Sequence, residues 1–386
     1  AGSKIRGEAA AHLDAANVGL GEYGAVFSDI SAHLEVEEGN KVWLDTSRCN
    51  HALARLVPAD RLVDAQTAAQ VMKAVKNAAE IDGMVEAHLR DGVAMAEFMG
   101  WIEAEVLAGR RVSEVQVHEV LTAARARQEG FIEPSFPSIA GVGTNGAIVH
   151  YFASEGPDMQ HFARDRNMLL DSGGQYDCGT TDVTRTWRFG SGSPAEFREM
   201  YTAVLRGHIA LDRAVWPDGT PGFVLDGFAR QHLWAAGADY GHGTGHGVGA
   251  ALNVHEGPMS ISKKYDIKEP IREHNVVSNE PGYYVQGEWG IRIENLVLVK
   301  AADLGAAAGK RESCGKKFLR FEKLTMIPIQ TGGMIEPGRM TGDELDWIDA
   351  YHRDVWERVG PRMEDGSVGK EWLRRNCAKV DRTPLK

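Results

Sequence analysis

The sequence has few cysteines, and none of them forms a closely spaced pair. Cys49, Cys178, Cys314 and Cys377 are scattered along 386 residues. This spacing contains no zinc–thiolate motif, and it fits a reducing compartment better than a disulfide framework. We therefore expect a cytoplasmic protein whose chemistry does not depend on thiol groups.

Long hydrophobic runs and basic clusters are also missing. No apolar run approaches the ~20 residues that a helix needs to span a bilayer. The net charge of −11 and the lack of a basic cluster argue against binding to a phosphate backbone. The sequence therefore predicts neither a membrane partner nor a nucleic-acid partner. A hydrophobic content of 43% is ordinary for a globular protein.

The first part of the chain has too few predicted elements to enclose a core of its own. These elements are a helix over residues 25–34 and short strands over residues 41–45 and 61–64. We expect residues 1–70 to form a partial α/β domain. Residues 71–386 should form a larger domain with a C-terminal helical tail. The chain begins at Ala1 rather than at a methionine, which suggests N-terminal truncation or processing.

The rest of the chain alternates predicted helices with strand-like segments that contain acids. A helical stretch covers residues 65–107, where Gly83 and Gly92 could interrupt it. Ser113 and Gln116 form a capping box for the next helix, and Thr341 and Glu344 form another before the last one. Further helices are predicted over 194–215, 221–236 and 341–358, a strand over 147–151 and a surface loop over 301–317. The repeated order of helices and then an acidic hairpin suggests two related halves around one site.

Two aspartates lie on segments that a turn at residues 177–179 would join into a hairpin. If the turn is centred between Tyr176 and Asp177, then Asp171 stands directly opposite Asp182. Directly opposed residues have Cβ atoms roughly 4.5–5.5 Å apart. The sequence therefore predicts a close pair of carboxylates in this hairpin.

Two glutamates repeat this arrangement in a second predicted hairpin. A turn centred on Gly287 places Glu280 directly opposite Glu294. A β-bulge would shift the register in either hairpin. The convergence of the four acids is therefore a hypothesis about both registers.

Four carboxylates in one place repel one another unless cations neutralise them. At ~4 Å and an effective dielectric of about 20, each like-charged pair costs about 4 kcal/mol. That is a large part of the roughly 5–15 kcal/mol that stabilises a typical protein. Two divalent cations would supply the missing positive charge. An oxygen-rich site with one imidazole suits manganese, magnesium or zinc, and the dominance of carboxylates favours manganese.

The imidazole comes from a glycine-rich loop between the two hairpins. Five glycines in Gly241–Gly249 let the backbone pass close to a site, and His246 stands among them. We interpret His246 as the fifth metal ligand. The same loop matches a relaxed dinucleotide-binding fingerprint, but no β-branched strand precedes it, and that pattern alone is weak.

Other polar residues near these segments have more than one interpretation. His242 lies in the same glycine-rich loop, and we interpret it as functional. His150 and His255 fit either a hydrogen-bonded structural role or a catalytic one. Arg292 either orients a ligand carboxylate or is a buried ion-pair partner. Thr184 either donates a hydrogen bond to a ligand or has a packing role.

Six segments of the chain resemble the signature of aminopeptidase P, the Xaa-Pro aminopeptidases. They are residues 170–176, 179–186, 242–249, 253–258, 280–284 and 290–295. The similarity runs from about Lys73 to the C-terminus, and it is greatest to the eukaryotic cytosolic, three-domain type. It implies the pita-bread metallopeptidase fold, an α+β architecture with two pseudo-symmetric halves. The partial domain before it would correspond to the second, creatinase/prolidase-like N-terminal domain.

The resemblance also implies roles for individual residues. The ligands of two metal ions, usually manganese, would be Asp171, Asp182, His246, Glu280 and Glu294. Substrate-binding and proton-transfer roles fall on His150, His242 and His255. Glu280 would also accept a proton from the attacking water, and Arg292 would contribute to substrate binding.

The implied reaction is hydrolysis of an N-terminal Xaa-Pro bond by a hydroxide that two metal ions activate. The expected substrates are peptides with proline in the second position, and the full-length protein is expected to be a homodimer. Two alternatives remain. One is a prolidase, which has the same ligands and needs a cap against longer peptides. The other is a non-catalytic peptide-binding relative, although such relatives usually lose metal ligands.

The sequence departs from the family pattern in a few places. Gly174 stands where alanine is common, and Asn279 stands where aspartate is common before Glu280. The second change could alter the hydrogen bonds around a ligand. The short N-terminal region puts full activity and native quaternary structure in question.

Overall fold

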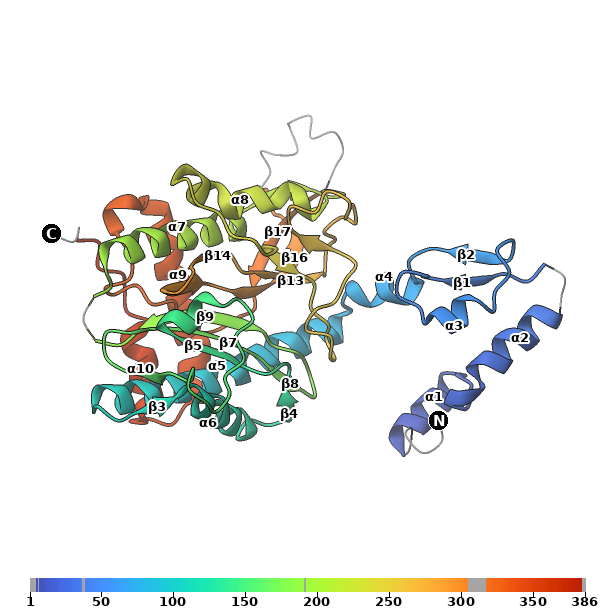
Figure 1. Cartoon of the computed structure of the whole chain (residues 1–386), viewed down its shortest axis with the longest axis horizontal. Helices are drawn as coiled ribbons and strands as arrows, with labels where there is room; N and C mark the ends of the chain where they lie inside the picture. Colours follow the sequence, from blue (N-terminus) through green and yellow to red (C-terminus); the bar gives the residue numbers. More distant parts are fainter. Residues whose placement is uncertain (1–4, 6, 37–38, 191, 305–316, 384–386) are drawn as a thin grey trace. The chain divides into compact units, whose positions relative to one another are not determined.

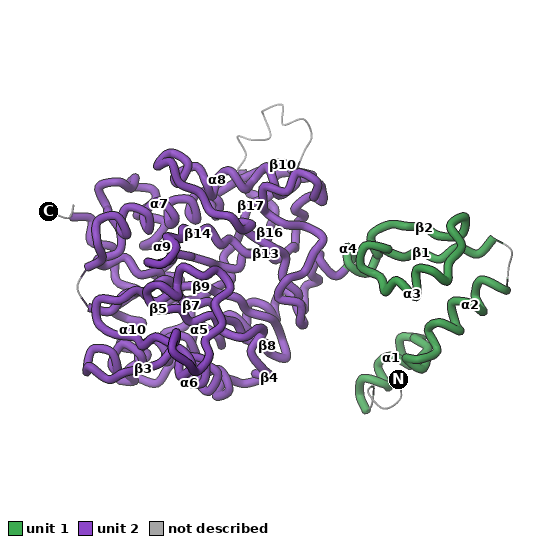
Figure 2. Tube along the Cα trace, viewed as in Figure 1, with its two compact units in different colours: residues 1–72 green, residues 73–386 purple. Residues whose placement is uncertain are grey.

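A computed structural model describes residues 5, 7–36, 39–190, 192–304 and 317–383. The chain divides into two compact units, one of residues 1–72 and one of residues 73–386 (Figure 2). Cys49, Cys178 and Cys377 are free thiols, while Cys314 lies outside the described residues. Within the described ranges, no helix combines the length and apolar character needed to cross a membrane.

The first unit consists of short elements (Figure 1). They are α1 Glu8–Ala15, η1 Tyr23–Ala25, α2 Val26–Val36, β1 Val42–Leu44, α3 His51–Ala54 and β2 Leu62–Asp64. The predicted helix and both predicted strands are confirmed, and the two strands pair in parallel. Among the described apolar side chains of residues 1–72, Val57 alone is buried. This unit therefore encloses very little core.

Two successive helices follow β2, and the first of them crosses the boundary after residue 72. The sequence predicted one helical stretch, but the structure divides it into α4 Ala68–Ala74 and α5 Ala78–Leu107. The break falls where Asn77 caps α5 with its side chain. Gly83 and Gly92 do not interrupt α5. They admit a neighbouring backbone, because a Cβ at either position would lie within 2.6 Å of a carbonyl oxygen.

A three-stranded antiparallel sheet forms the centre of the first half of this unit. Its order is β5-β7-β9, and α5 and α6 pack against it (Figure 1). Ser113 caps α6 as predicted, because its hydroxyl accepts the Gln116 N–H at 3.1 Å. The elements are β3 Val112–Ser113, α6 Glu114–Ala126, β4 Phe131–Pro134, β5 Ile139–Val142, β6 His161–Phe162, β7 Asn167–Ser172, β8 Gly174–Tyr176 and β9 Val183–Arg188.

The strand predicted over residues 147–151 is wrong. The short helix η2 Gly143–Ala147 occupies the start of this segment, and turns follow it. The backbone bonds locally rather than to a sheet, since the Ile148 N–H donates to Asn145 O and the Tyr151 N–H donates to Ile148 O, both at 3.1 Å. Local hydrogen bonds therefore override the strand propensity of the β-branched residues here.

A four-stranded antiparallel sheet forms the centre of the second half. Its order is β10-β17-β16-β13, and α7 and α8 pack against it with a separate apolar core (Figure 1). Both helices were predicted from the sequence. The elements are α7 Ala195–Asp212, β10 Val215–Pro217, α8 Gly222–Ala235, β11 Gly245–His246, β12 Ser260–Ile261, β13 Val276–Asn279, β14 Gly282–Val285, β15 Trp289–Arg292, β16 Asn295–Ala301 and β17 Phe318–Lys323.

The C-terminal part of the chain packs onto the first half. Its elements are η4 Pro337–Arg339, α9 Gly342–Val359, η5 Gly360–Arg362 and α10 Val368–Asn376. The predicted capping box at Thr341 and Glu344 is present, with both reciprocal hydrogen bonds formed. Of the loop predicted over residues 301–317, residues 305–316 lie outside the described residues.

A buried arginine connects the two halves. Arg185 lies on β9, and its guanidinium donates to Glu294 O at 2.6 Å and to Asn295 Oδ1 at 2.8 Å. It also donates to Ile327 O at 2.6 Å. Because Arg185 is fully buried, these bonds satisfy a charged group that would otherwise be costly to desolvate. The arginine therefore fixes β9 against the segment that carries Glu294.

Candidate metal centre

The five candidate ligands come from different strands and loops, and all of them line one cavity of about 600 Å³. Asp171 lies on β7, Asp182 directly precedes β9, His246 lies on β11, Glu280 follows β13 and Glu294 precedes β16. Ligand atoms of Asp182, His246 and Glu294 lie within 4.8 Å of one another. His246 Nε2 is also 3.4 Å from Glu280 Oε1.

The register predicted for the first hairpin is wrong. Asp171 faces Thr184 rather than Asp182. The turn closes one residue later than expected, with the Tyr176 N–H donating to Gly179 O at 2.8 Å. Asp182 is therefore a diagonal neighbour of Asp171 instead of its direct partner. The two acids still line the same cavity, because a shift of two residues in pairing keeps a side chain on the same face of the sheet.

The register predicted for the second hairpin is confirmed. The β13–β16 and β14–β15 ladders share it, and Glu280 and Glu294 occupy the break between them. Pro281 has no N–H with which to continue the ladder. The backbone of each glutamate bonds elsewhere: the Glu280 N–H donates to Thr244 O at 2.8 Å, and the Glu294 N–H donates to Thr184 O at 3.1 Å. These bonds tie Glu280 to the segment before β11 and Glu294 to β9.

Burial makes these acids difficult to ionise without a cation. Desolvation, together with the charges of the other acids, raises the pKa of Asp182 and that of Glu294 well above their usual range. Burial also raises the pKa of Glu280 to about 7. The mutual repulsion that the sequence predicted is therefore a feature of the folded protein.

The donor groups fit divalent cations. Asp171 Oδ1 is buried and has no hydrogen-bond partner among the described residues. His246 Nδ1 is 3.0 Å from Gly247 O, which directs its proton to the carbonyl and leaves the Nε2 lone pair facing the acids. Four carboxylates and one neutral imidazole form an oxygen-rich set of the kind that manganese, magnesium or zinc binds.

A chain of hydrogen bonds runs from the acids to His242. Arg292 donates to Asp171 Oδ2 at 2.7 Å and to the Tyr284 hydroxyl at 2.8 Å. That hydroxyl lies 2.9 Å from His242 Nε2. His242 Nδ1 is 2.7 Å from Gly243 O, so Tyr284 donates to an imidazole that is neutral. Burial lowers the pKa of His242 to about 4. Through its bond to Asp171, Arg292 orients a candidate ligand.

The other two candidate histidines line the same cavity. The His255 ring lies 4.2 Å from the His246 ring, centroid to centroid, in an edge-to-face arrangement. Burial lowers the pKa of His255 below its ordinary value. His150 faces the cavity from the segment that follows η2. Apolar side chains complete the wall, namely Phe136, Ile139, Val149, Val254 and Ile267.

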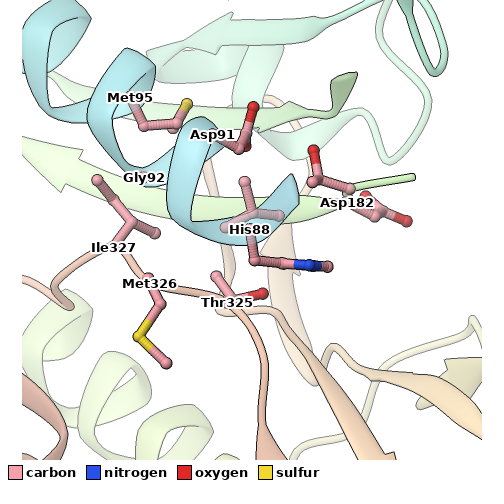
Figure 3. A pocket seen from close by; sticks show the side chains of 10 residues that line it. His88, Asp91, Gly92, Met95, Asp182, Thr325, Met326 and Ile327 are labelled. Atoms are coloured by element: carbon pink, nitrogen blue, oxygen red, sulfur yellow. The ribbon is translucent and has the colours of Figure 1, made fainter. Parts of the chain in front are cut away.

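Asp182 also borders a much smaller cavity on the side toward α5. His88, Asp91 and Met95 of this helix line it together with residues 325–327 (Figure 3). Its volume of about 10 Å³ is close to that of one water molecule. Packed protein therefore supports Asp182 from behind, whereas its other side faces the large cavity.

The structure reveals site residues that sequence reasoning missed. Tyr284 connects Arg292 with His242, and only its position two residues after Pro-Gly in the 280–284 motif could have indicated it. Outside the cavity lining, Lys76 forms a buried ion pair with Glu256 at 2.7 Å, although 180 residues separate them. No local pattern indicates such a pair. Asn279 points away from the ligands, and its amide donates to His208 O of α7 at 2.9 Å.

The fold and the acidic site fit a family of metallopeptidases. Residues 82–301 match metallopeptidase family M24, and residues 317–380 match the C-terminal region of peptidase M24. Residues 1–80 match the creatinase/prolidase N-terminal domain. The chain belongs to metallopeptidase family M24, and the predicted α+β pita-bread fold is confirmed.

Proteins with similar sequences indicate a group within this family. The chain is 51% identical over 304 residues to aminopeptidase P2 of Arabidopsis thaliana, covering 79% of this chain and 42% of that protein. It is 42% identical to a probable Xaa-Pro aminopeptidase P of Coprinopsis cinerea, covering 89% of this chain and 55% of that protein. The chain thus spans about half the length of the curated relatives it matches.

A solved structure agrees with these similarities. The X-prolyl aminopeptidase of Caenorhabditis elegans superposes with a TM-score of 0.88 at 35% identity. The match covers 97% of this chain and 60% of that one. The worm protein is a cytosolic enzyme with a dinuclear active site. Its similarity extends over both units of the present chain.

Proposed function

We propose that this chain is the catalytic part of a metal-dependent exopeptidase that hydrolyses the N-terminal Xaa-Pro bond of peptides. The observation that carries the proposal is the convergence of four acids and His246 on one cavity. The 51% identity to an aminopeptidase P supports the choice of reaction. Residues 71–386 would be the catalytic domain, and residues 1–70 part of the domain that precedes it.

The proposed cofactor is a pair of manganese ions. Asp171, Asp182, His246, Glu280 and Glu294 would hold them. When bound, such ions lower the pKa of a water molecule and polarise a carbonyl group. The oxygen-rich donor set supports manganese over softer metals. The C. elegans structure supports two ions rather than one, since that enzyme has a dinuclear active site.

The chain's own side chains would handle the protons. Glu280, whose Oε1 lies 3.4 Å from His246 Nε2 in the cavity, would accept a proton from the attacking water. His242, which Tyr284 orients through a 2.9 Å hydrogen bond, would contact the substrate at the cavity wall. The nitrogen of proline leaves as a secondary amine, and His150 or His255 at the cavity wall would protonate it.

The assay that tests this function uses three peptides that differ in one feature each. We expect the manganese-loaded chain to release the first residue of an Xaa-Pro-Xaa tripeptide and to leave an Xaa-Ala-Xaa tripeptide intact. Comparison with the Xaa-Pro dipeptide separates the aminopeptidase from a prolidase. Cleavage of the dipeptide alone would contradict the proposal. Binding of the tripeptide without cleavage by the metal-loaded protein would indicate a non-catalytic relative.

The proposed setting follows from the family relationship. We infer a cytoplasmic enzyme, as the C. elegans relative is cytosolic. A homodimer of the full-length protein is the proposed quaternary state. Sedimentation of the full-length protein in the presence of manganese tests that state, and a single species of monomer mass would contradict it.

A further inference from the structure

One buried carboxyl group outside the metal centre has an unusual set of partners. Glu114 is the first residue of α6, and it is fully buried. Its Oε1 accepts the Val142 N–H at 2.7 Å, and its Oε2 accepts the Gln160 N–H and the Tyr151 hydroxyl, both at 2.8 Å. The Asn145 amide donates to both oxygens, at 3.1 and 3.0 Å.

All of these partners belong to residues 142–160. Val142 ends β5, and Gln160 directly precedes β6, so Glu114 bonds both ends of the connection between the two strands. Tyr151 lies in the middle of that connection. The Glu114 side chain therefore holds the two ends of the segment together and also binds its centre.

Apolar burial does not explain the position of this segment. Ile148 is 52% exposed and Phe152 is 68% exposed. Beyond η2 the segment has no helix or strand of its own until β6. Residues 148–160 have no regular structure, and such a connection would sample many conformations if nothing held it. The polar contacts to Glu114 therefore restrain the segment, together with the packing of η2 and the bonds that Asn145 and Thr144 make within it.

His150 lies in this segment, directly before Tyr151, and it faces the large cavity. We propose that Glu114 is a positioning residue that holds His150 at the cavity wall. The consequence for catalysis rests on the function proposed above. A preorganised side chain saves the cost of ordering it for each substrate. Tyr151 transmits the restraint, because its hydroxyl bonds Glu114 and its backbone adjoins His150.

Two variants test this role at different strengths. Glu114→Gln keeps the shape of the side chain but replaces one carboxylate oxygen with an NH2 donor. That donor then faces the N–H and O–H groups that bound the oxygen. Tyr151→Phe removes the hydroxyl beside His150, which donates to Glu114 and accepts from the Asn145 amide at 2.9 Å. Asp212→Asn is the matched control. Asp212 is also a buried acid, and it accepts the Trp347 Nε1–H at 2.7 Å. Both residues are far from residues 142–160 in the sequence.

Hydrogen exchange gives the first readout. We expect Glu114→Gln to increase amide exchange at least about tenfold within residues 143–160, with little change elsewhere. Manganese content should stay that of the wild type, and Asp212→Asn should leave this segment unchanged. Unchanged exchange within residues 143–160 in Glu114→Gln would overturn the proposal. If that variant does not fold, Tyr151→Phe decides the question in the same way.

Epistasis with His150 gives the second readout. We expect Glu114→Gln to lower kcat/KM for an Xaa-Pro-Xaa peptide by about 10–100-fold in the wild type. In a His150→Ala background the same change should lower it by less than about twofold. Equal losses in both backgrounds would overturn the proposal, since Glu114 would then act independently of His150. A wild-type chain with no peptidase activity would defeat the proposed function, and the exchange measurement would still decide whether Glu114 restrains the segment.

Discussion

Thr184 and Glu294 bind each other twice. The Thr184 hydroxyl donates to Glu294 Oε2 at 2.7 Å, while the Thr184 carbonyl accepts the Glu294 N–H at 3.1 Å. The two residues come from different halves of the catalytic unit. Thr184 thus orients a candidate ligand and joins the halves at the same point, which resolves the two roles that the sequence left open.

Removal of that hydroxyl should weaken metal binding. Thr184→Val keeps the volume of the side chain but leaves Glu294 Oε2 without its donor. Loss of a partner behind a metal ligand typically costs roughly 10–100-fold in affinity. We expect a rise of this size in the Kd for manganese by isothermal titration calorimetry. Thr184→Ser keeps the donor and should bind as the wild type does; equal affinity of the valine variant would show that the bond does not matter.

His246 should be essential for metal binding. Its Nε2 lies 3.5 Å from Asp182 Oδ2 and 3.4 Å from Glu280 Oε1, so His246→Ala removes a central donor. We expect a lower manganese content by mass spectrometry and no detectable cleavage of an Xaa-Pro-Xaa peptide. His242→Ala should lose activity while retaining metal. Retained turnover and metal content in His246→Ala would refute the ligand assignment.

Glu280 should make the metal-free protein less stable as the pH rises, relative to a Glu280→Gln variant. Burial raises the pKa of Glu280 from 4.5 to about 7, so the folded state holds a proton that the unfolded state releases. Its contribution is fully present below pH 4.5, and it is lost as the pH rises to about 7. The loss is about 3 kcal/mol.

Urea unfolding of metal-free protein across this pH range measures the effect. We expect the wild type to decline relative to Glu280→Gln, because glutamine does not titrate. Manganese should reduce that decline in the wild type, since a cation stabilises the ionised acid. A wild-type curve that rises with pH in parallel with the Glu280→Gln curve would contradict this prediction.

Gly245 should be irreplaceable beside His246. A Cβ at Gly245 would lie 2.0 Å from Ser278 O, so alanine must push β11 away from β13. We expect Gly245→Ala to destabilise the protein by about 2–4 kcal/mol and to weaken manganese binding. Gly241→Ala is the matched control, because a Cβ there would meet no atom within 4 Å. Thermal unfolding with and without manganese compares the two, and equal Tm values would refute the steric argument.

Hairpin register shows how far sequence reasoning extended into the site. The register around Glu280 and Glu294 was predictable because the turn at Gly287 has the expected centre. The register at Asp171 was not, because the turn after Tyr176 closes one residue later. Both acids of the first hairpin still reached the cavity, since side chains two residues apart share a face.

The sequence by itself determined the identity of the five candidate ligands, the capped helices α6 and α9, and the order of two helical and acidic halves. Those features depend on local spacing, which a linear chain displays directly. The tertiary structure alone decided which groups contact the site residues and their segments: Arg292 on Asp171, Tyr284 on His242, and Glu114 on the segment of His150. Such contacts join residues that are distant in the chain, and they arise only when packing of the two halves fixes their side chains in space.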